Sequence, residues 1–114
     1  MPPNGKSDQN RSTRGLPSSY TGREWLYLRR LGVAIAEIRR ERGVSQAALA
    51  EMCGLSRVHV QNIEGGLINP TVLSIWALAE ALQIEVALLY KFNPPAEHEQ
   101  AKRPVRARKR NQQD

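Results

Sequence analysis

The fold of this 114-residue chain is decided by residues 45–64, which read SQAALAEMCGLSRVHVQNIE. Ser45 and Ser56 have the character of helix N-caps, because a serine hydroxyl accepts a hydrogen bond from a free backbone N–H at a helix start. Gly54 lies between them and tolerates the left-handed backbone that a tight turn requires. The stretch therefore predicts two short helices joined by a tight turn.

The two helices, expected at residues 46–52 and 56–64, carry the apolar side chains that would pack them together. Ala50 is small at the point where the two helix backbones must approach closely. The residues expected to fill the wedge between the helices are Leu49, Leu55, Val60 and Ile63. This arrangement is typical of a helix-turn-helix unit, whose second helix enters the DNA major groove.

A longer helix is expected before this unit. Thr21 and Glu24 have the spacing of a capping box, and Gly43 ends the helix after a basic last turn. An apolar stripe at three- and four-residue steps runs between them. It consists of Trp25, Leu28, Leu31, Ile35 and Ile38. Gly32 interrupts the pattern, so either one long helix or two shorter ones would fit.

Two more helices are expected after the unit. Pro70 suits the first position of a fourth helix, where a backbone N–H would have no partner. A short fifth helix ends before Asn93. The inner residues are Val72, Ile75, Ala79 and Leu82 in the fourth helix, and Val86 and Leu89 in the fifth. No segment alternates like a strand. The predicted fold is all-α, a compact five-helix domain with an extended first helix.

The positive charge of the chain lies mostly in its ends. Lys and Arg number 17 against 11 Asp and Glu, a net charge of +6. Residues 1–20 carry +2 and residues 93–114 carry +3, whereas residues 21–92 hold eight basic and seven acidic residues. Both ends are rich in proline and lack a periodic apolar pattern, so we expect them to be disordered tails around one folded domain at 21–92. The net charge itself indicates a nucleic acid partner.

Other classes of protein are disfavoured by the composition. Cys53 is the single cysteine, so no internal disulfide framework forms and a cytoplasmic location fits. No apolar run is long enough for a membrane span, and no secretory signal opens the chain. Besides Cys53, only His59 and His98 could assist a metal site or a nucleophilic pair. We therefore expect no metal, no cofactor and no enzymatic activity.

From about Leu31 to Tyr90, the sequence resembles the Cro and phage-repressor-like helix-turn-helix family, also called the XRE type. The matched positions are Ile38-Arg39, Ser45-Gln46, Leu49-Ala50, Gly54-Leu55-Ser56, Ile63-Glu64, Asn69-Pro70 and Leu78-Ala79. The resemblance implies an all-helical, usually dimeric, sequence-specific DNA binder that regulates transcription. The chain departs from the family in two places. Gln83 stands where glycine is common, and Trp25 to Leu28 extend the first helix.

Helical geometry indicates which side chains of the helix at 56–64 would face DNA. With Val60 and Ile63 inward, Val58 and Asn62 point directly outward, at about 100° per residue. Gln61 and His59 lie on the flanks, and Arg57 lies on the first turn. These five residues are the candidate base contacts, with His59 equally well explained as an ordinary exposed residue. Family precedent also points to Arg57, Val58 and Asn62.

Contacts outside the base-reading face are expected from helix ends and from the resemblance. Gln46 and Ser56 lie beside helix N-termini, which favour anions, so they are candidate phosphate contacts. Gln46 is also indicated by family precedent. The resemblance further implies a structural ion pair between Arg39 and Glu64, linking the first helix to the end of the third.

The surfaces of the last two helices leave two interpretations open. Their apolar residues extend beyond one face, which favours either a dimer interface or a thick local core containing Trp25 or Leu28. The dimer interface candidates are Leu73, Trp76, Leu88 and Tyr90. The role of the basic segment 102–110 also has two interpretations. It is either an arm that contacts DNA phosphates or the minor groove, or a solvated end.

The sequence thus predicts a homodimeric transcription regulator, most simply a repressor, that binds a palindromic operator in double-stranded DNA. The recognition helix is Ser56–Glu64. A restriction-modification controller is one alternative. Another is an antitoxin or other protein-interaction module, whose protein partner would bind the Trp25–Leu28 extension and the tail. A structural nucleoid protein without sequence preference is a third.

Overall fold

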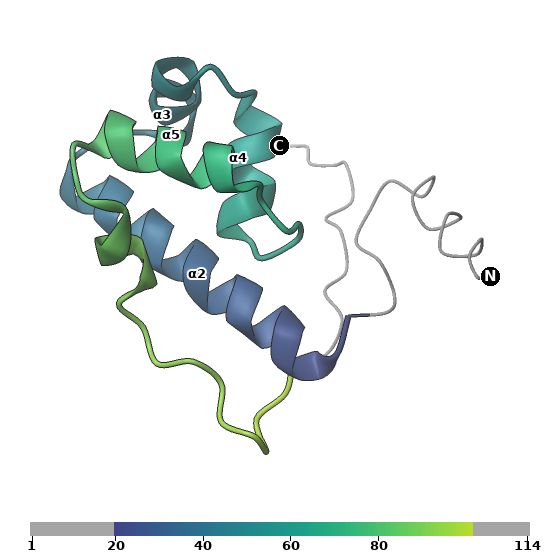
Figure 1. Cartoon of the computed structure of the whole chain (residues 1–114). Coiled ribbons are helices and arrows are strands. Elements are labelled where there is room, and N and C mark those ends of the chain that lie inside the picture. Colours follow the sequence, from purple (N-terminus) through teal and green to yellow (C-terminus); the bar gives the residue numbers. More distant parts are fainter. Residues whose placement is uncertain (1–19, 102–114) are drawn as a thin grey trace.

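The structure, a computed structural model, describes residues 20–101, and its elements are all helical. They are α2 (Gly22–Glu41), α3 (Gln46–Cys53), α4 (Arg57–Glu64), α5 (Val72–Leu82) and the 3-10 helix η2 (Val86–Tyr90). Helices α3, α4 and α5 gather on one side of the long helix α2 (Figure 1). The all-α prediction is confirmed, but the expected fifth helix is a single stretch of 3-10 helix. Within residues 20–101, no helix is long and apolar enough to cross a membrane.

Helix α2 is one continuous helix of 20 residues that passes through Gly32. Its capping box forms as predicted, with the Thr21 hydroxyl accepting from the N–H of Glu24 and the Glu24 carboxylate accepting from the N–H of Thr21. Gly32 is there for packing. A Cβ at this position would collide with the backbone carbonyl oxygens of Ile63 and Glu64. The last turn of α4 therefore lies directly against the backbone of α2.

The other helix starts follow the serine and threonine positions. Ser45, Ser56 and Thr71 each accept a hydrogen bond from the backbone N–H three residues later. Thr71 thus caps α5 and the helix begins at Val72, so the expectation that Pro70 is its first residue is wrong. The Thr71 hydroxyl accepts from the N–H of Ser74, whereas the side chain of Asn69, which would be the cap if Pro70 were the first residue, donates to the Tyr20 hydroxyl instead.

The C-cap residues of α3 and α5 adopt a left-handed backbone. Gly54 has φ of +74° at the end of α3, as the turn between the two short helices requires. Gln83 has φ of +60° at the end of α5, the position where the related family often has glycine. A side chain at this φ costs about 1 kcal/mol relative to glycine, so the departure of the sequence from the family is a local cost in stability.

The main core lies where α3, α4, α5 and η2 pack against the second half of α2. Its most buried members are Ile35, Leu49, Val60, Ile63, Leu78, Leu82 and Leu89. The predicted inner positions Ile75, Ala79 and Leu82 are buried, but Val72 is 83% exposed. Val72 shares a face of α5 with Ala79, yet it is the first residue of the helix and borders surface hollows beyond the core.

A second, smaller cluster surrounds the extension at the start of α2. Trp25 and Leu28 are 3% and 8% exposed and pack with residues from both ends of the described chain and from the loop after α4. Those partners are Tyr20, Leu67, Ile68 and Ala101. The extension of α2 is therefore built into the domain by its own small core.

Residues 93–101, expected to open a disordered tail, are part of the described structure and return along α2. Arg23 donates to the carbonyl oxygens of Pro95 and Ala96, and Arg30 donates to the carbonyl oxygen of Asn93. Arg30 also pairs with Glu99 at 3.1 Å. The N–H of Ala96 and then the guanidinium of Arg30 lower the pKa of Glu99, so its carboxylate is charged at neutral pH. Residues 1–19 and 102–114 lie outside the described residues.

The close approach at Gly32 makes a strong prediction. Gly32→Ala should destabilise the protein by about 1–3 kcal/mol, because the added methyl group forces α4 away from α2. In an ordinary helix interior, alanine is more stabilising than glycine by about 1 kcal/mol. Helix propensity alone therefore predicts that Gly32→Ala stabilises the protein. Urea unfolding followed by circular dichroism measures the difference, with Val33→Ala on the exposed face of α2 as control. A stabilised Gly32→Ala protein would show that this contact is not tight.

Candidate nucleic-acid interface

Helix α4 packs against the core and against α2, and its remaining face is exposed. Val60 and Ile63 are fully or almost fully buried, Leu55 just before the helix is half-buried, and Gly32 lies against the last turn. The face that remains begins at Arg57, which is exposed, and continues at Val58, which is 61% exposed. At this exposure the Val58 side chain buries little apolar surface within the described domain.

The five candidate base contacts all lie on α4, but Asn62, predicted to point directly outward like Val58, is only as accessible as the flanking residues. Arg57 and Val58 are exposed, whereas His59, Gln61 and Asn62 are half-buried. The N–H of His59 donates to the Ser56 hydroxyl, which ties its backbone to the helix cap. The structure thus groups all five on one short helix, with Arg57 and Val58 as the most accessible.

A buried hydrogen-bonded network fixes the end of α4. The carboxylate of Glu64 accepts from Arg39 in a two-pronged pair, with Nε to Oε2 at 2.7 Å and Nη2 to Oε1 at 3.1 Å. The side chains of the pair are only 10% and 6% exposed. A third donor, the side-chain amide of Gln46, reaches Oε1 at 2.8 Å. Arg39 also donates to the carbonyl oxygen of Val44.

This network joins three helices at one carboxylate, because Arg39 comes from α2, Gln46 begins α3 and Glu64 ends α4. Charged and bidentate hydrogen bonds are the most directional that side chains form. The network therefore sets the angle of α4 relative to its scaffold. In this network one N–H of the Gln46 side-chain amide is already donated to Glu64 of the same chain.

Cys53, at the end of α3, behaves as a packing residue. Its thiol is half-buried with Sγ 3.6 Å from the carbonyl oxygen of Ala77, and burial raises its pKa. A thiol with a raised pKa holds little of the reactive thiolate. In the part of the chain that the structure describes, no three His, Cys, Asp or Glu side chains lie together in a way that would hold a metal ion.

The dimer interface candidates form an exposed apolar patch on α5 and η2. Leu73 is 73% exposed, Trp76 53%, Leu88 42% and Tyr90 39%. Because these four side chains are exposed, they do not form the thick local core of the alternative interpretation, although Leu28 lines the same hollow as Tyr90. Together with Val72, we call these five residues the α5–η2 patch.

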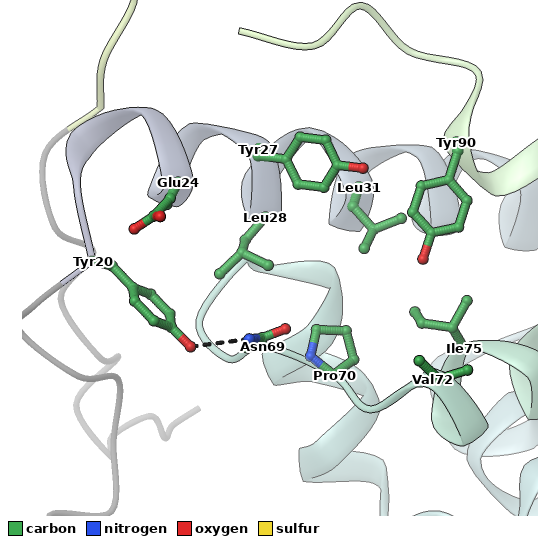
Figure 2. A pocket seen from close by; sticks show the side chains of 10 residues that line it. All are labelled: Tyr20, Glu24, Tyr27, Leu28, Leu31, Asn69, Pro70, Val72, Ile75 and Tyr90. Carbon is green, nitrogen blue, oxygen red and sulfur yellow. Dashed lines mark hydrogen bonds between the residues drawn. The ribbon is translucent and has the colours of Figure 1, made fainter. Parts of the chain in front are cut away.

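A hollow of about 340 Å³ adjoins the α5–η2 patch, between α2, the loop before α5 and η2. Figure 2 shows Tyr27, Leu28 and Leu31 of α2 opposite Pro70, Val72 and Ile75, with Tyr90 on η2 closing one side. Asn69 donates to the hydroxyl of Tyr20 at the other side, at 3.1 Å. A second apolar hollow shares Val72, Ile75 and Tyr90 and includes Leu73 and Trp76. The exposed apolar surface is therefore a patch with adjoining hollows.

Sequence reasoning missed three structural features of the domain. It treated Gly32 as an interruption, although an isolated glycine in a helical pattern commonly marks a close packing contact. It did not identify Gln46 as the third member of the Glu64 network. It also missed the contacts of Arg23 and Arg30 with the segment at 93–101, for which no local sequence signal exists.

A helical scaffold with an exposed helix held by a buried network defines a helix-turn-helix protein, and comparison with known families agrees. A family model described as helix-turn-helix (HTH_3) matches residues 35–89. The chain belongs to the XRE-type helix-turn-helix family, whose members are DNA-binding transcription regulators rather than enzymes.

Three relatives illustrate the range of this family. The uncharacterized HTH-type transcriptional regulator y4dJ of Sinorhizobium fredii is 36% identical over 54 residues, which are 47% of this chain and 70% of that protein. The immunity repressor protein of Bacillus phage phi105 is 37% identical over 62% of this chain and 49% of its own length. The crystal structure of the restriction-modification controller protein C.AhdI from Aeromonas hydrophila is 39% identical, with a TM-score of 0.54 over 54% of this chain and 94% of that one.

Removing the carboxylate at the centre of the network should unfold the protein more easily and weaken DNA binding. Glu64→Ala leaves Arg39 buried without its partner, which costs about 3–5 kcal/mol and lowers the melting temperature by more than about 10 °C. Thermal unfolding and DNA titration measure the two effects, with Glu51→Ala, an exposed carboxylate on α3, as control. An unchanged melting temperature and affinity would contradict the role of the network.

Proposed function

We propose that the protein is a sequence-specific transcription regulator, acting as a repressor, that binds a palindromic operator as a homodimer. The observation that supports this most strongly is the outward face of α4. Its exposed arginine and valine lie on a helix whose other sides are buried and whose end is fixed by the Glu64 network. A rigidly held, exposed helix of this length fits the major groove.

Each outward residue suits a particular base edge. Arg57 donates two hydrogen bonds to O6 and N7 of guanine, Asn62 pairs with the adenine edge, and Val58 packs on a thymine methyl group. Gln61 and His59, on the flanks of the helix, reach neighbouring bases. The half-buried position of Asn62 limits the freedom of its side chain, which lowers the entropy lost on binding.

Backbone contacts come from the starts of α3 and α4. Gln46 uses one N–H of its amide for Glu64, and the second N–H is the donor that we assign to a DNA phosphate. Ser56 caps α4 and donates its hydroxyl proton to a second phosphate. Such contacts fix the orientation of the protein on DNA without reading sequence.

The homodimer is supported by the α5–η2 patch. Leu73, Trp76 and Tyr90 are exposed and line one apolar hollow, and Leu88 is exposed on the same short helix as Tyr90. A two-fold interface requires such a self-complementary surface. Two recognition helices are also needed to read enough base pairs for useful specificity.

A restriction-modification controller is the narrower form of this function that one comparison favours, because C.AhdI is matched over 94% of its length. A restriction or methyltransferase gene beside the coding sequence would support it. The antitoxin alternative has less support. It depended on the Trp25–Leu28 extension and the tail as partner surfaces, and in the extension Trp25 and Leu28 are buried against their own chain.

The base contacts are tested with a DNA duplex enriched by the wild-type protein from a random pool. Arg57→Ala and Asn62→Ala should each weaken binding by about 1–3 kcal/mol, roughly 10- to 100-fold, and relax the preference at one position of the site. Arg40→Ala, which removes the same charge from the exposed end of α2, is the control for Arg57→Ala. Equal losses for Arg40→Ala and Arg57→Ala would rule out base reading by Arg57.

The dimer is tested separately by substitutions that leave the net charge unchanged. Leu73→Gln with Trp76→Gln should convert a dimer at tens of micromolar into a monomer, because both side chains lose their apolar contact with the partner. Sedimentation equilibrium in moderate salt measures the mass, with Val33→Gln on another exposed face as control. A monomeric wild-type protein at that concentration would contradict the assignment.

A further inference from the structure

The hollow between α2, the loop before α5 and η2 has a lining that the proposed function does not use. Its volume of about 340 Å³ falls in the range of about 300–1,000 Å³ that is usual for small-molecule sites. Three of its lining residues are tyrosines, namely Tyr20, Tyr27 and Tyr90, so we call it the tyrosine hollow. It is large enough to hold a small organic molecule.

The three tyrosine rings are held in place by other aromatic side chains. The ring centroids of Tyr20 and the buried Trp25 are 4.9 Å apart. Phe92 packs edge-on against Tyr27, with centroids 5.2 Å apart, and its ring centroid is 6.3 Å from that of Tyr90. Side chains that are already packed lose little conformational entropy when a ligand contacts them. The aromatic lining is therefore preorganised.

The charge of the tyrosine hollow is negative. Among the described residues that line it, Glu24 alone carries a formal charge. One oxygen of Glu24 caps α2 by accepting from the N–H of Thr21, and Glu24 takes part in neither of the two ion pairs within residues 20–101. A concave surface with charge of one sign attracts ligands of the opposite sign. The hollow thus favours a cation and disfavours a DNA phosphate.

The floor of the tyrosine hollow is apolar. Leu28, Leu31 and Ile75 line it and are buried, and Pro70 and Val72 line the wall on the side of α5. Such a floor cannot replace the hydration shell of a small inorganic cation, but it does remove the apolar part of an organic ligand from water. The lining therefore suits a molecule with both a positive charge and an apolar body.

We propose that the tyrosine hollow binds an amphipathic organic cation, with a quaternary ammonium group as its charged part. The face of a tyrosine ring is negative and attracts a cation that lies within about 6 Å of the ring centroid. Figure 2 shows Glu24 and Tyr20 at one end of the hollow and Tyr90 at the other, with Tyr27 between them on α2. Rings and carboxylate thus surround one apolar floor.

The tyrosine hollow borders the α5–η2 patch without coinciding with it. Val72 and Tyr90 belong to both surfaces, whereas Leu73 and Trp76 line only the neighbouring apolar hollow. Substitutions at Leu73 and Trp76 therefore alter the surface proposed for a second copy and leave the lining of the tyrosine hollow intact. This separates a small cation from a second copy as the occupant.

The test follows backbone amide resonances of the labelled full-length protein during titration with benzyltrimethylammonium. Benzyl alcohol serves as the uncharged comparison and benzenesulfonate as the anionic one. The cation should bind saturably at about millimolar concentrations, with the largest shifts at Tyr27, Asn69 and Tyr90. It should bind at least roughly threefold more tightly than benzyl alcohol, and benzenesulfonate should not bind.

Two substitutions test the charge and the aromatic ring separately. Glu24→Gln removes the charge but keeps a side-chain oxygen that can cap α2, and it should weaken binding of the cation roughly threefold without affecting benzyl alcohol. Glu51→Gln, at an exposed carboxylate on α3, is the matched control. Tyr27→Leu should weaken binding of the cation roughly three- to tenfold, whereas Tyr27→Phe, which keeps the ring, should retain it.

Three results would overturn the inference. They are equal affinity for the cation and benzyl alcohol, unchanged affinity in both Glu24→Gln and Tyr27→Leu, and binding of the cation only after Leu73→Gln with Trp76→Gln. The last result would show that a second copy occupies the hollow. No DNA is present in these titrations, so their outcome is independent of the proposed function.

Discussion

The carboxylate of Glu64 is the point on which the rest of the structure depends. It is buried at the end of α4 and accepts hydrogen bonds from Arg39 of α2 and Gln46 of α3. Beside it, Gly32 allows the backbones of α2 and α4 to meet. A buried charge of this kind adds little net stability compared with an apolar contact, but it permits one geometry only. Its role is therefore to fix the direction of α4 while the apolar core supplies the stability.

Three surfaces take their places from this arrangement. The outward face of α4 lies opposite the buried Val60 and Ile63. The α5–η2 patch lies on the helices that follow, with its hollows beside it (Figure 2). A third region, the start of α2, where Tyr20 and Ala101 both pack on Trp25 and Leu28, adjoins the loop after α4. One domain thus carries an exposed helix face and an exposed apolar patch on different elements.

Local patterns predicted most of the fold because the signals are local. Serine and threonine caps, Gly54 and the apolar stripe of α2 each act within one or two helical turns, and the helix bounds agree with them. The candidate base contacts could be chosen for the same reason, since helical periodicity settles which residues oppose Val60. The return of residues 93–101 along α2 could not be predicted. Proline content and the lack of periodicity indicated disorder, whereas its hydrogen bonds join residues about 70 positions apart.

The exposure of apolar residues at helix ends was also not predicted. Helical periodicity gives the direction of a side chain but not the point at which the helix stops packing on the core. Val72 has the angular position of a core residue but lies beyond the packed part of α5.

The claim that α4 meets DNA is tested most directly by following backbone amide resonances of the labelled protein during titration with the enriched duplex. The account predicts the largest shifts at residues 57–62 and at the starts of α3 and α4. Shifts centred on the α5–η2 patch, with residues 57–62 unaffected, would contradict it.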